Sequence, residues 1–391
     1  MKKILTLLFL FDSLFCFSQN DSVPVSRTQD RQHFSVQLTY QHGYVFGTNA
    51  FLKGKNIESQ KIKAFQTVSV KFSKQTVGKK LWEQLYQYPN WGFGAYLADF
   101  YHPRDVGYPI AVYGFLNSPF KRWRTSAFNF EIGFGATFNW KCFNPLTNQY
   151  NTAIGAGQSF LIDAGLNFEQ RLLKKLAVSI GFSVTHFSNG ALKKPNFGIN
   201  TIAPRVGIKY NFFEAPAFIK QAVPHYHANN EWLLSVFGGA KNVVYDSVST
   251  GILEKYEGVF FPVFGLSALY NRQISYKSKF GLGMTFSYDG SVNAQVAVDN
   301  NEIKKVKGPL GDNLQLSIYP SYELVAGRVS IILQPAFYLY RKKMMNQSPV
   351  FHQRIGLKYH LTNHIFVGIT LRDYHFHVSD FVEWSVGYRI R

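Results

Sequence analysis

The sequence predicts an all-β fold, an antiparallel transmembrane β-barrel of about 14–16 strands, with two 8-stranded units as the alternative. Aromatic side chains are abundant, with 37 Phe and 23 Tyr among 391 residues, whereas charged residues make up only 17%. Short segments in which apolar and small or polar residues alternate recur along the chain, separated by Gly, Pro, Asn and Lys. Beyond the N-terminus, no segment has the roughly 20 continuous apolar residues that a spanning helix needs. A soluble β-sandwich, the competing class, needs no apolar stripe on so many strands.

The N-terminal stretch MKKILTLLFLFDSLFCFSQN combines two lysines, an apolar run and small residues near its end. This pattern predicts a secretory signal peptide over residues 1–18, cleaved after Ser18. A lipid anchor on Cys16 is the alternative, but the bulky Phe15 before it argues against a lipoprotein. After cleavage Cys142 is the remaining cysteine, so the sequence excludes an intramolecular disulfide and CxxC chemistry.

The formal net charge of +19 indicates acidic partners. An exported chain meets anionic lipid headgroups first, so we expect lipid A or lipopolysaccharide as the partner and no nucleic acid. The sequence predicts no particular oligomeric state. It contains no HExxH, GxSxG or GxxxxGK[ST] motif, and we expect no cofactor. We expect no metal either, because His375 and His377, near Asp373 and Asp380, are more simply interpreted as rim histidines.

Strand candidates follow one another along almost the whole chain. Alternation is sharpest in GRVSIILQPAFYLYR, residues 327–341, and in the last segment, where apolar side chains face lipid and polar ones face the interior. The expected strands cover residues 34–46, 61–73, 92–101, 107–117, 125–138, 158–171, 176–188, 200–213, 231–241, 257–271, 276–288, 312–325, 327–340, 350–361, 363–373 and 379–390.

The connections between these strands predict their orientation. Short turns follow the even-numbered strands, and longer polar loops such as 139–157 and 289–311 follow odd-numbered ones. Periplasmic turns are short and extracellular loops long, so the end of strand 176–188 should lie near the extracellular rim. Two long connections break the rule. We expect a short amphipathic helix in 74–91, and a plug, lid or linker in 214–230.

The chain divides into residues 1–18 as signal peptide, 19–213 as a barrel half that carries the site described below, and 214–391 as further barrel strands. GFSVTHFS (181–188) and GITLRDYHFH (368–377) are weakly similar, which leaves two eight-stranded units open. A single barrel is favoured, because one closed sheet needs no edge between the halves.

Polar side chains lie on the apolar face of strand 176–188. The two-residue period that aligns Val178, Ile180, Phe182 and Val184 places His186 and Ser188 on the same outward face. On the next strand, equal parity places Asn200 on the outward face. Pairing 186 with 200 also pairs 180 with 206 and 178 with 208, apolar against apolar. We therefore expect His186, Ser188 and Asn200 to cluster at the rim.

A hydroxyl, an imidazole and an orienting amide are the components of nucleophilic acyl transfer. The imidazole takes the serine proton, and the third group holds the tautomer of the ring. The simpler interpretation is that His186 belongs to an interfacial belt of amphipathic side chains. A site that faces lipid nevertheless has a suitable substrate, since a lipid in the outer leaflet arrives from the side.

The segment THFSNGALKKPNFGIN, residues 185–200, resembles the active-site segment of the PagL-type lipid A 3-O-deacylases and the related acyloxyacyl hydrolases. These are outer-membrane β-barrel esterases that remove an acyl chain from lipopolysaccharide. The resemblance implies His186 as base, Ser188 as nucleophile, and Asn189 with Gly190 in the oxyanion hole. Asn196, in the Pro-Asn step of the motif, is a further substrate-binding candidate.

Two adjacent lysines, Lys193 and Lys194, suit the phosphates of lipid A as point charges. At Asn200 the chain departs from the family, which has an acidic residue there, and no Asp or Glu occurs between 171 and 213 to replace it. An Asn carbonyl accepts a hydrogen bond from the imidazole N–H but cannot stabilise imidazolium by charge. In a serine triad, Asn for Asp costs roughly 10⁴ in rate when the wrong tautomer is held.

The sequence therefore predicts an outer-membrane serine esterase that hydrolyses an ester-linked acyl chain of lipid A, with its site near the extracellular rim. The competing hypothesis is a non-enzymatic barrel, a porin or transporter, in which the site is a relic. The position of the site and the openness of the lumen distinguish the two.

Overall fold

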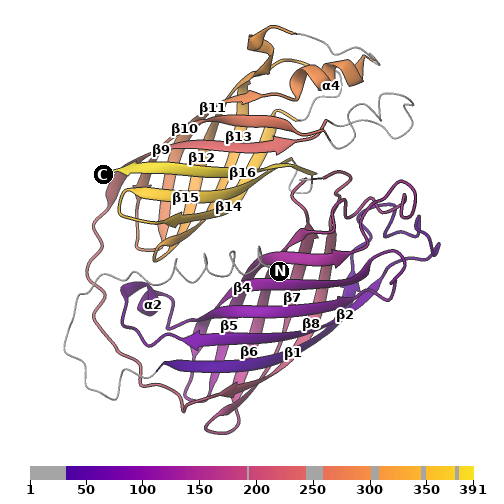
Figure 1. Cartoon of the computed structure of the whole chain (residues 1–391). Coiled ribbons are helices and arrows are strands. Elements are labelled where there is room, and N and C mark those ends of the chain that lie inside the picture. Colours follow the sequence, from indigo (N-terminus) through magenta and orange to yellow (C-terminus); the bar gives the residue numbers. More distant parts are fainter. Residues whose placement is uncertain (1–31, 192, 244–258, 301–307, 345–348, 375–377) are drawn as a thin grey trace, which may run out of the picture.

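In the part of the chain that the structure describes, sixteen antiparallel strands close into two separate barrels of eight strands each, which lie side by side (Figure 1). The computed structural model describes residues 32–191, 193–243, 259–300, 308–344, 349–374 and 378–391. The expected signal peptide and the alternative anchor on Cys16 lie outside the described residues, as do His375 and His377.

The first barrel is closed by pairing of its first and last strands, in which Leu38 lies opposite Ile208. Its strands are β1 (His33–Val45), β2 (Ala64–Gln75), β3 (Asn90–Asp99), β4 (Gly107–Arg122), β5 (Ser126–Trp140), β6 (Ser159–Arg171), β7 (Leu176–Ser188) and β8 (Ile199–Asn211). The second barrel is closed in the same way, with Val386 opposite Val236. Its strands are β9 (Asn229–Lys241), β10 (Phe261–Gln273), β11 (Ser278–Asp289), β12 (Leu314–Ala326), β13 (Val329–Tyr340), β14 (Phe351–His360), β15 (Ile365–Tyr374) and β16 (Val378–Ile390).

The expected all-β transmembrane barrel fold is confirmed. The strands form two eight-stranded units, which was the alternative to a single barrel of about 14–16 strands. The single barrel that the sequence favoured is wrong, because β8 returns to β1 and does not pair with β9. The argument against free sheet edges does not separate the two arrangements, since each eight-stranded sheet satisfies its own edges by closing. Eight strands also leave an interior just wide enough for side chains to fill.

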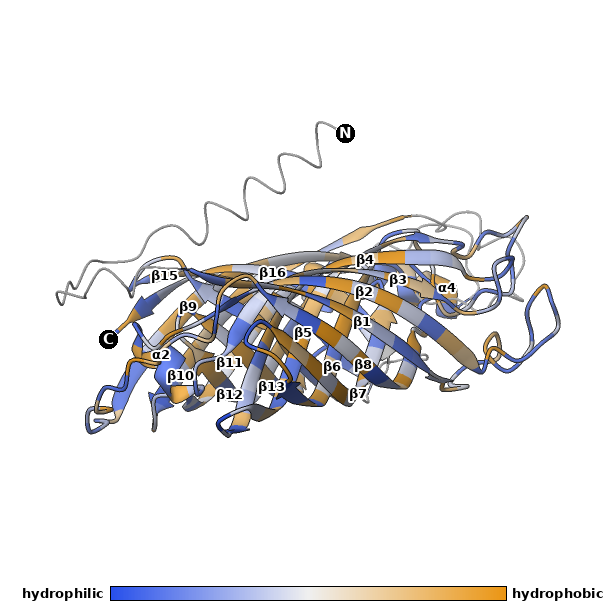
Figure 2. Cartoon of the chain, turned by 90° about the horizontal axis from the view of Figure 1, so that it is seen from below, coloured by the Kyte–Doolittle hydropathy of each residue, from blue (hydrophilic) through white to orange (hydrophobic). Residues whose placement is uncertain are grey.

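Hydrophobic and hydrophilic residues alternate along the strands (Figure 2), which gives the strands an apolar outer face and a polar inner face. On β2, for example, Val68, Val70 and Phe72 are exposed on the outside, whereas Ser69 and Lys71 are buried inside. The outer faces form the surface that meets lipid, and backbone hydrogen bonds are satisfied between strands, as a bilayer requires. None of the helices in the described part of the chain has the length and apolar character needed to cross a membrane.

Paired charges fill the interiors of both barrels. In the first barrel Glu131 accepts hydrogen bonds from Lys71 at 2.7 Å and from Arg205 at 3.0 Å. In the second, Arg372 and Glu383 form an ion pair at 2.6 Å. Buried charges are tolerated when they are paired and hydrogen-bonded. The second barrel encloses a cavity of only about 50 Å³ among such residues.

Connections after odd-numbered strands gather at one end of the molecule and those after even-numbered strands at the other (Figure 1). The helix expected in 74–91 is confirmed as α2 (Leu81–Leu85), between β2 and β3. The connection between β11 and β12 contains α4 (Val292–Asp299) and the 3₁₀ helix η2 (Leu310–Asn313). Of the three roles considered for 214–230, the segment is a linker between the barrels.

Contacts join the two barrels at the short-turn end. The Tyr86 hydroxyl, just after α2, donates to the Val325 carbonyl at 2.9 Å, and Lys277 Nζ lies 4.7 Å from the centroid of the Tyr86 ring. The linker packs beside α2, since Phe218 stacks on Tyr88 with ring centroids 4.5 Å apart. These contacts fix the second barrel alongside the first.

The long loops of the first barrel pack over its mouth as a hydrophobic cap. We define the loop cap as residues 46–63, 100–106 and 141–158. Its apolar side chains share one cluster with barrel residues, and Phe187 of β7 lies in that cluster. The Phe187 ring is 5.3 Å from that of Trp140 and 6.0 Å from that of Phe100, centroid to centroid. The cap therefore fixes the outer end of β7, where the candidate site begins.

Candidate active site

His186 lies near the outer end of β7 on the outward face. The neighbouring residues Thr185 and Phe187 are buried inside, whereas Val184 is exposed on the same face as His186. The expected register is confirmed, because 186 pairs with Asn200, 180 with 206 and 178 with 208. The apolar pairs below therefore set the register that brings the histidine and the asparagine together.

The imidazole of His186 is hydrogen-bonded to the side chain of Asn200, with Nδ1 and Oδ1 2.6 Å apart. An amide oxygen only accepts, so Nδ1 is the donor. In the neutral ring this assigns the hydrogen to Nδ1 and leaves the lone pair on Nε2. The arrangement thus leaves Nε2 able to accept a proton.

Gly198 lies against the other side of this imidazole, a residue that sequence reasoning did not single out. Its φ is +70°, and a Cβ built on it would lie only 2.8 Å from Cε1 of His186. Any other residue would be strained in this conformation and would crowd the ring. Its place in the motif ending in Asn200 was visible in the sequence, but the contact depends on how the loop returns to β8.

Ser188, the last residue of β7, has its hydroxyl turned toward the loop that follows. The Oγ atom accepts hydrogen bonds from the Asn196 side-chain Nδ2 at 2.7 Å and from the Gly190 backbone N–H at 3.2 Å. Within the described residues, no hydrogen bond joins Ser188 Oγ to the His186 imidazole. Catalytic hydrogen bonds are often long or poorly aligned without substrate and tighten when it binds. The geometry without substrate is therefore compatible with His186 acting on Ser188.

The loop 189–198 holds these donors in place through its own hydrogen bonds. Asn189 is fully buried, its backbone N–H donates to Asn196 Oδ1 at 3.0 Å, and its Nδ2 donates to the Lys193 carbonyl at 2.7 Å. Asn196 therefore holds the loop with its oxygen while its nitrogen points at Ser188. Gly190 has a φ of +63°, in the left-handed region that favours glycine, and its backbone N–H donates to Ser188 Oγ.

The two loop lysines lie in different surroundings. Lys193 is exposed, whereas Lys194 is half-buried. Burial lowers the pKa of Lys194, while the nearby carboxylates of Asp380 and Asp289 act in the opposite direction and Lys241 reinforces the decrease. All three of these neighbours belong to the second barrel. Lys193 is thus the more accessible of the two to solvent.

The second barrel reaches the candidate site, which sequence reasoning placed on the first barrel alone. A Cβ built on Gly190 would lie 2.7 Å from Cγ2 of Val382 and 3.5 Å from Cδ1 of Leu371. Val382 lies on β16 and Leu371 on β15. No signal in the sequence identifies them, because an outward residue that meets another barrel has the same period as one that meets lipid.

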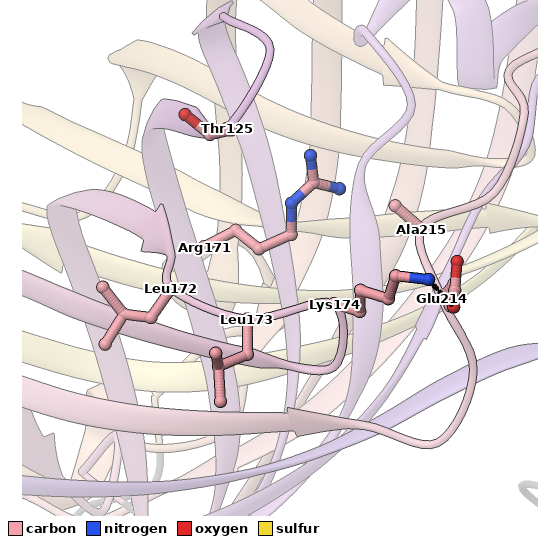
Figure 3. Close-up of a pocket in the computed structure, with 7 residues that line it drawn as sticks. All are labelled: Thr125, Arg171, Leu172, Leu173, Lys174, Glu214 and Ala215. Carbon is pink, nitrogen blue, oxygen red and sulfur yellow. Dashed lines mark ion pairs between the residues drawn. The ribbon is translucent and has the colours of Figure 1, made fainter.

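A larger cavity lies at the opposite end of the first barrel (Figure 3). Its volume is about 520 Å³, and it is bordered by the turn between β6 and β7 and by the start of the linker. Lys174 and Glu214 form an ion pair at 3.1 Å there, with both side chains largely exposed. This cavity brings no hydroxyl and imidazole together, and we do not regard it as the catalytic site.

Two family models match the sequence. Residues 66–209 match the model described as lipid A 3-O-deacylase (PagL), and residues 230–391 match the model described as acyloxyacyl hydrolase, C-terminal domain. The first match contains the whole His186 to Asn200 segment. No curated protein matches the sequence.

Solved outer-membrane proteins are similar to the chain at low identity. CdiB from Acinetobacter baumannii is 8% identical, with a TM-score of 0.19, 92% of this chain covered and 60% of CdiB covered. Omp33 from the same species is 9% identical, with a TM-score of 0.16 and coverage of 92% and 98%. The translocator domain of NalP from Neisseria meningitidis is 9% identical, with a TM-score of 0.20 and coverage of 100% and 97%. The chain thus spans less than two thirds of CdiB, and TM-scores this low carry no argument about function.

The two family models lie one on each barrel, and the first leaves β1 unmatched. The chain therefore belongs to the PagL-type lipid A 3-O-deacylase and acyloxyacyl hydrolase family, and it is an outer-membrane β-barrel.

Proposed function

We propose that this chain is a serine esterase that hydrolyses an ester-linked acyl chain of lipid A. The observation that carries the proposal is the outward-facing pair of His186 and Asn200, with Ser188 two residues along the same strand. The outer wall of a membrane barrel faces lipid, so a lipid with ester-linked acyl chains can approach these side chains from the side. The family membership of the chain supports the same substrate class.

In this proposal His186 acts as the general base. As Ser188 Oγ attacks the ester carbonyl carbon, its proton passes to Nε2, and the Nδ1–H remains hydrogen-bonded to Asn200. Collapse of the tetrahedral intermediate breaks the bond to the sugar oxygen, which takes the proton back from Nε2. A water molecule, activated by the same base, then hydrolyses the acyl-enzyme and frees the fatty acid. The serine hydroxyl must exchange its loop donors for Nε2 when the substrate binds.

Two donors that converge on Ser188 Oγ are suited to stabilise the oxyanion. They are the Gly190 backbone N–H and the Asn196 Nδ2, which come from different parts of the loop. Donors fixed before the reaction stabilise the charge that develops on the carbonyl oxygen. Asn189, which is fully buried and hydrogen-bonded within the loop, supports this arrangement and does not itself face the oxyanion.

Asn200 supplies orientation without charge. Its Oδ1 accepts from Nδ1, which selects the tautomer with a free Nε2. The cost of roughly 10⁴ in rate for Asn in place of Asp applies when the asparagine holds the wrong tautomer of the histidine. Here Asn200 accepts from Nδ1 and holds the tautomer in which Nε2 can take the serine proton. We therefore expect slower chemistry than with a carboxylate, but not loss of activity.

The interiors of the barrels favour an enzyme over a porin. Ion pairs such as Arg205 with Glu131 and Arg372 with Glu383 occupy the lumens, and the cavity inside the second barrel is about 50 Å³. These are the interiors of packed eight-stranded barrels, without the aqueous lumen of larger ones. A site on the outer wall needs no pore, because its lipid substrate diffuses in the membrane.

Mass spectrometry of lipid A tests the proposal in cells. Lipid A from cells that express the protein should lose the mass of one ester-linked acyl chain, relative to lipid A from otherwise identical cells without it. Expression of the Ser188→Ala variant at the same level should leave the lipid A intact. Identical lipid A with and without the wild-type protein would refute the proposal.

A further inference from the structure

Two loops of the cap bring three metal-ligating side chains together in the first barrel. Glu58 lies in the loop between β1 and β2, and His102 and Asp105 lie in the loop between β3 and β4. One potential ligand atom of each side chain lies within 4.8 Å of the others. None of these three residues belongs to the proposed catalytic set, and the inference does not depend on esterase activity.

The separations of the ligand atoms suit a shared metal ion. Nδ1 of His102 lies 3.2 Å from Oε2 of Glu58 and 3.9 Å from Oδ2 of Asp105. Two ligands that are each about 2.1 Å from one tetrahedral zinc ion lie about 3.4 Å apart. The two observed separations lie on either side of that value, and the ligand atoms of Glu58 and Asp105 lie within 4.8 Å of each other, so side-chain movements of about 1 Å would allow all three to coordinate one ion.

His102 provides a second observation that indicates a ligand. The residue is only 7% exposed, and its Nδ1 is a buried atom that makes no hydrogen bond in the described part of the chain. Nδ1 is close to Glu58 Oε2 but is not in hydrogen-bond geometry with it. Most buried side-chain polar atoms in proteins have a hydrogen-bond partner, and an exception aimed at two carboxylates suggests an ion.

Asp105 is held in place by the loops around it. It is completely buried, and its two carboxylate oxygens accept from the backbone N–H groups of Ile57 at 2.8 Å and of Glu58 at 3.4 Å. Its backbone carbonyl accepts from Asn148 Nδ2 at 2.9 Å. Among the described residues, the ion pairs of both carboxylates are with His102 alone. A dication would compensate two carboxylates that lie together at low exposure.

We propose that Glu58, His102 and Asp105 bind a divalent transition-metal ion, Zn²⁺ or Mn²⁺, that fastens the β1–β2 loop to the β3–β4 loop. One imidazole nitrogen with two carboxylates suits these ions, whereas Ca²⁺ and Mg²⁺ prefer ligand sets made of oxygen alone. The β3–β4 loop begins with Phe100, which packs on Phe187 beside His186. The ion therefore stabilises the cap that fixes the outer end of β7.

Metal titration of the purified full chain tests this site. The protein is prepared in detergent without a histidine tag, treated with chelator, and exchanged into buffer that contains Zn²⁺, Mn²⁺, Ca²⁺ or Mg²⁺. Bound metal is then measured by elemental mass spectrometry after gel filtration, and the unfolding midpoint is measured in parallel. We expect one Zn²⁺ or Mn²⁺ per chain and a midpoint that rises with its concentration. Ca²⁺ and Mg²⁺ should leave the midpoint unchanged.

Glu58→Gln is the primary variant, because the Glu58 side chain is the least buried of the three, at 22% exposed, and the amide keeps its shape. It and His102→Ala should weaken metal affinity by more than about 100-fold, since even outer-shell changes cost 10–100-fold. Glu214→Gln, at the opposite end of the barrel, is the matched charge control. The paired linker histidines, with His225 and His227 ring centroids 5.2 Å apart, are replaced by alanine to exclude adventitious zinc binding.

Three results would overturn the inference. They are no stoichiometric Zn²⁺ or Mn²⁺ on the wild-type chain, unchanged affinity in folded Glu58→Gln, and loss of the bound metal when His225 and His227 are replaced. An equal response to Ca²⁺ would overturn the assignment to a transition metal. Folding of each variant is checked by the shift in electrophoretic mobility on heating, which a closed barrel shows and an unfolded chain does not.

Discussion

Nδ1 of His186 lies 2.6 Å from Oδ1 of Asn200, across the β7–β8 pair and on the outer wall of the first barrel. The contact joins a titratable ring to a neutral amide where the family motif has an acidic residue. The chemistry of the site therefore depends on an orienting group that carries no charge.

Replacing this amide by a carboxylate tests its role. Asn200→Glu should preserve or raise the deacylation rate, because a carboxylate stabilises the imidazolium that forms as Ser188 attacks. The roughly 10⁴-fold effect of the Asp/Asn exchange in serine triads sets the ceiling for the gain. Release of fatty acid from lipopolysaccharide in detergent measures the rate. Asn200→Leu, which removes the acceptor, should lower it.

The opposite outcome for Asn200→Glu would also be informative. A folded variant without activity would show that the site has adapted to a neutral third residue and that desolvation of the carboxylate outweighs its charge.

Removing one donor to Ser188 tests the proposed oxyanion hole. Asn196→Ala deletes the Nδ2 group that lies 2.7 Å from Oγ, together with the Oδ1 that accepts from the Asn189 N–H, and loss of one oxyanion donor typically costs about 10²–10³ in kcat. The KM should change far less. Asn211→Ala, on β8 at the short-turn end of the barrel, is the control. A kcat for Asn196→Ala within a factor of two of wild type would remove this residue from the mechanism.

Gly198→Ala tests whether the glycine positions the imidazole. The added Cβ would meet Cε1 of His186 at 2.8 Å, and the φ of +70° is unfavourable for alanine by about 1–2 kcal/mol. We expect at least a tenfold loss of activity, while the barrel still folds. Gly157→Ala is the matched control, since its Cβ would meet nothing within 4 Å. Equal activity of the two variants would contradict this role.

Contact with the second barrel can be tested without changing the site itself. Val382, 5% exposed, lies against Gly190, whereas Val386, on the same strand and face, is 53% exposed. Val382→Trp should displace the loop and reduce the rate of deacylation, because overpacking a filled contact forces neighbours to move. Val386→Trp should behave like wild type in the same assay. A loss that is equal in both variants would point to the membrane surface of β16 and not to this contact.

Much of the candidate site could be predicted from sequence because it depends on strand parity. Side chains alternate with a period of two, so the apolar pairs 178–208 and 180–206 were enough to place residue 186 opposite 200. The loop lengths predict the extracellular orientation of the end of β7, which stays a prediction. Both inferences use local patterns that a barrel strand must keep.

Contacts between distant segments could not be predicted in this way. The alternation of apolar and polar residues on each strand is the same whether β8 pairs with β1 or with β9. The sequence therefore could not distinguish one barrel from two, and the single barrel it favoured is wrong. Gly190 and Val382 meet because two barrels lie side by side, and Glu58 meets His102 because two loops fold over one mouth. Loop residues have no period from which such contacts follow.

The most direct test of the account is the activity of purified Ser188→Ala against lipopolysaccharide, with fatty acid release and lipid A mass measured together. Ser183→Ala is the matched control, because Ser183 lies on the same strand but faces the interior, where its hydroxyl donates to Gln41 at 3.1 Å. We predict that Ser188→Ala and His186→Ala fold as barrels and release no fatty acid, while Ser183→Ala retains most of the wild-type rate. Wild-type activity in folded Ser188→Ala would show that this serine is not the nucleophile.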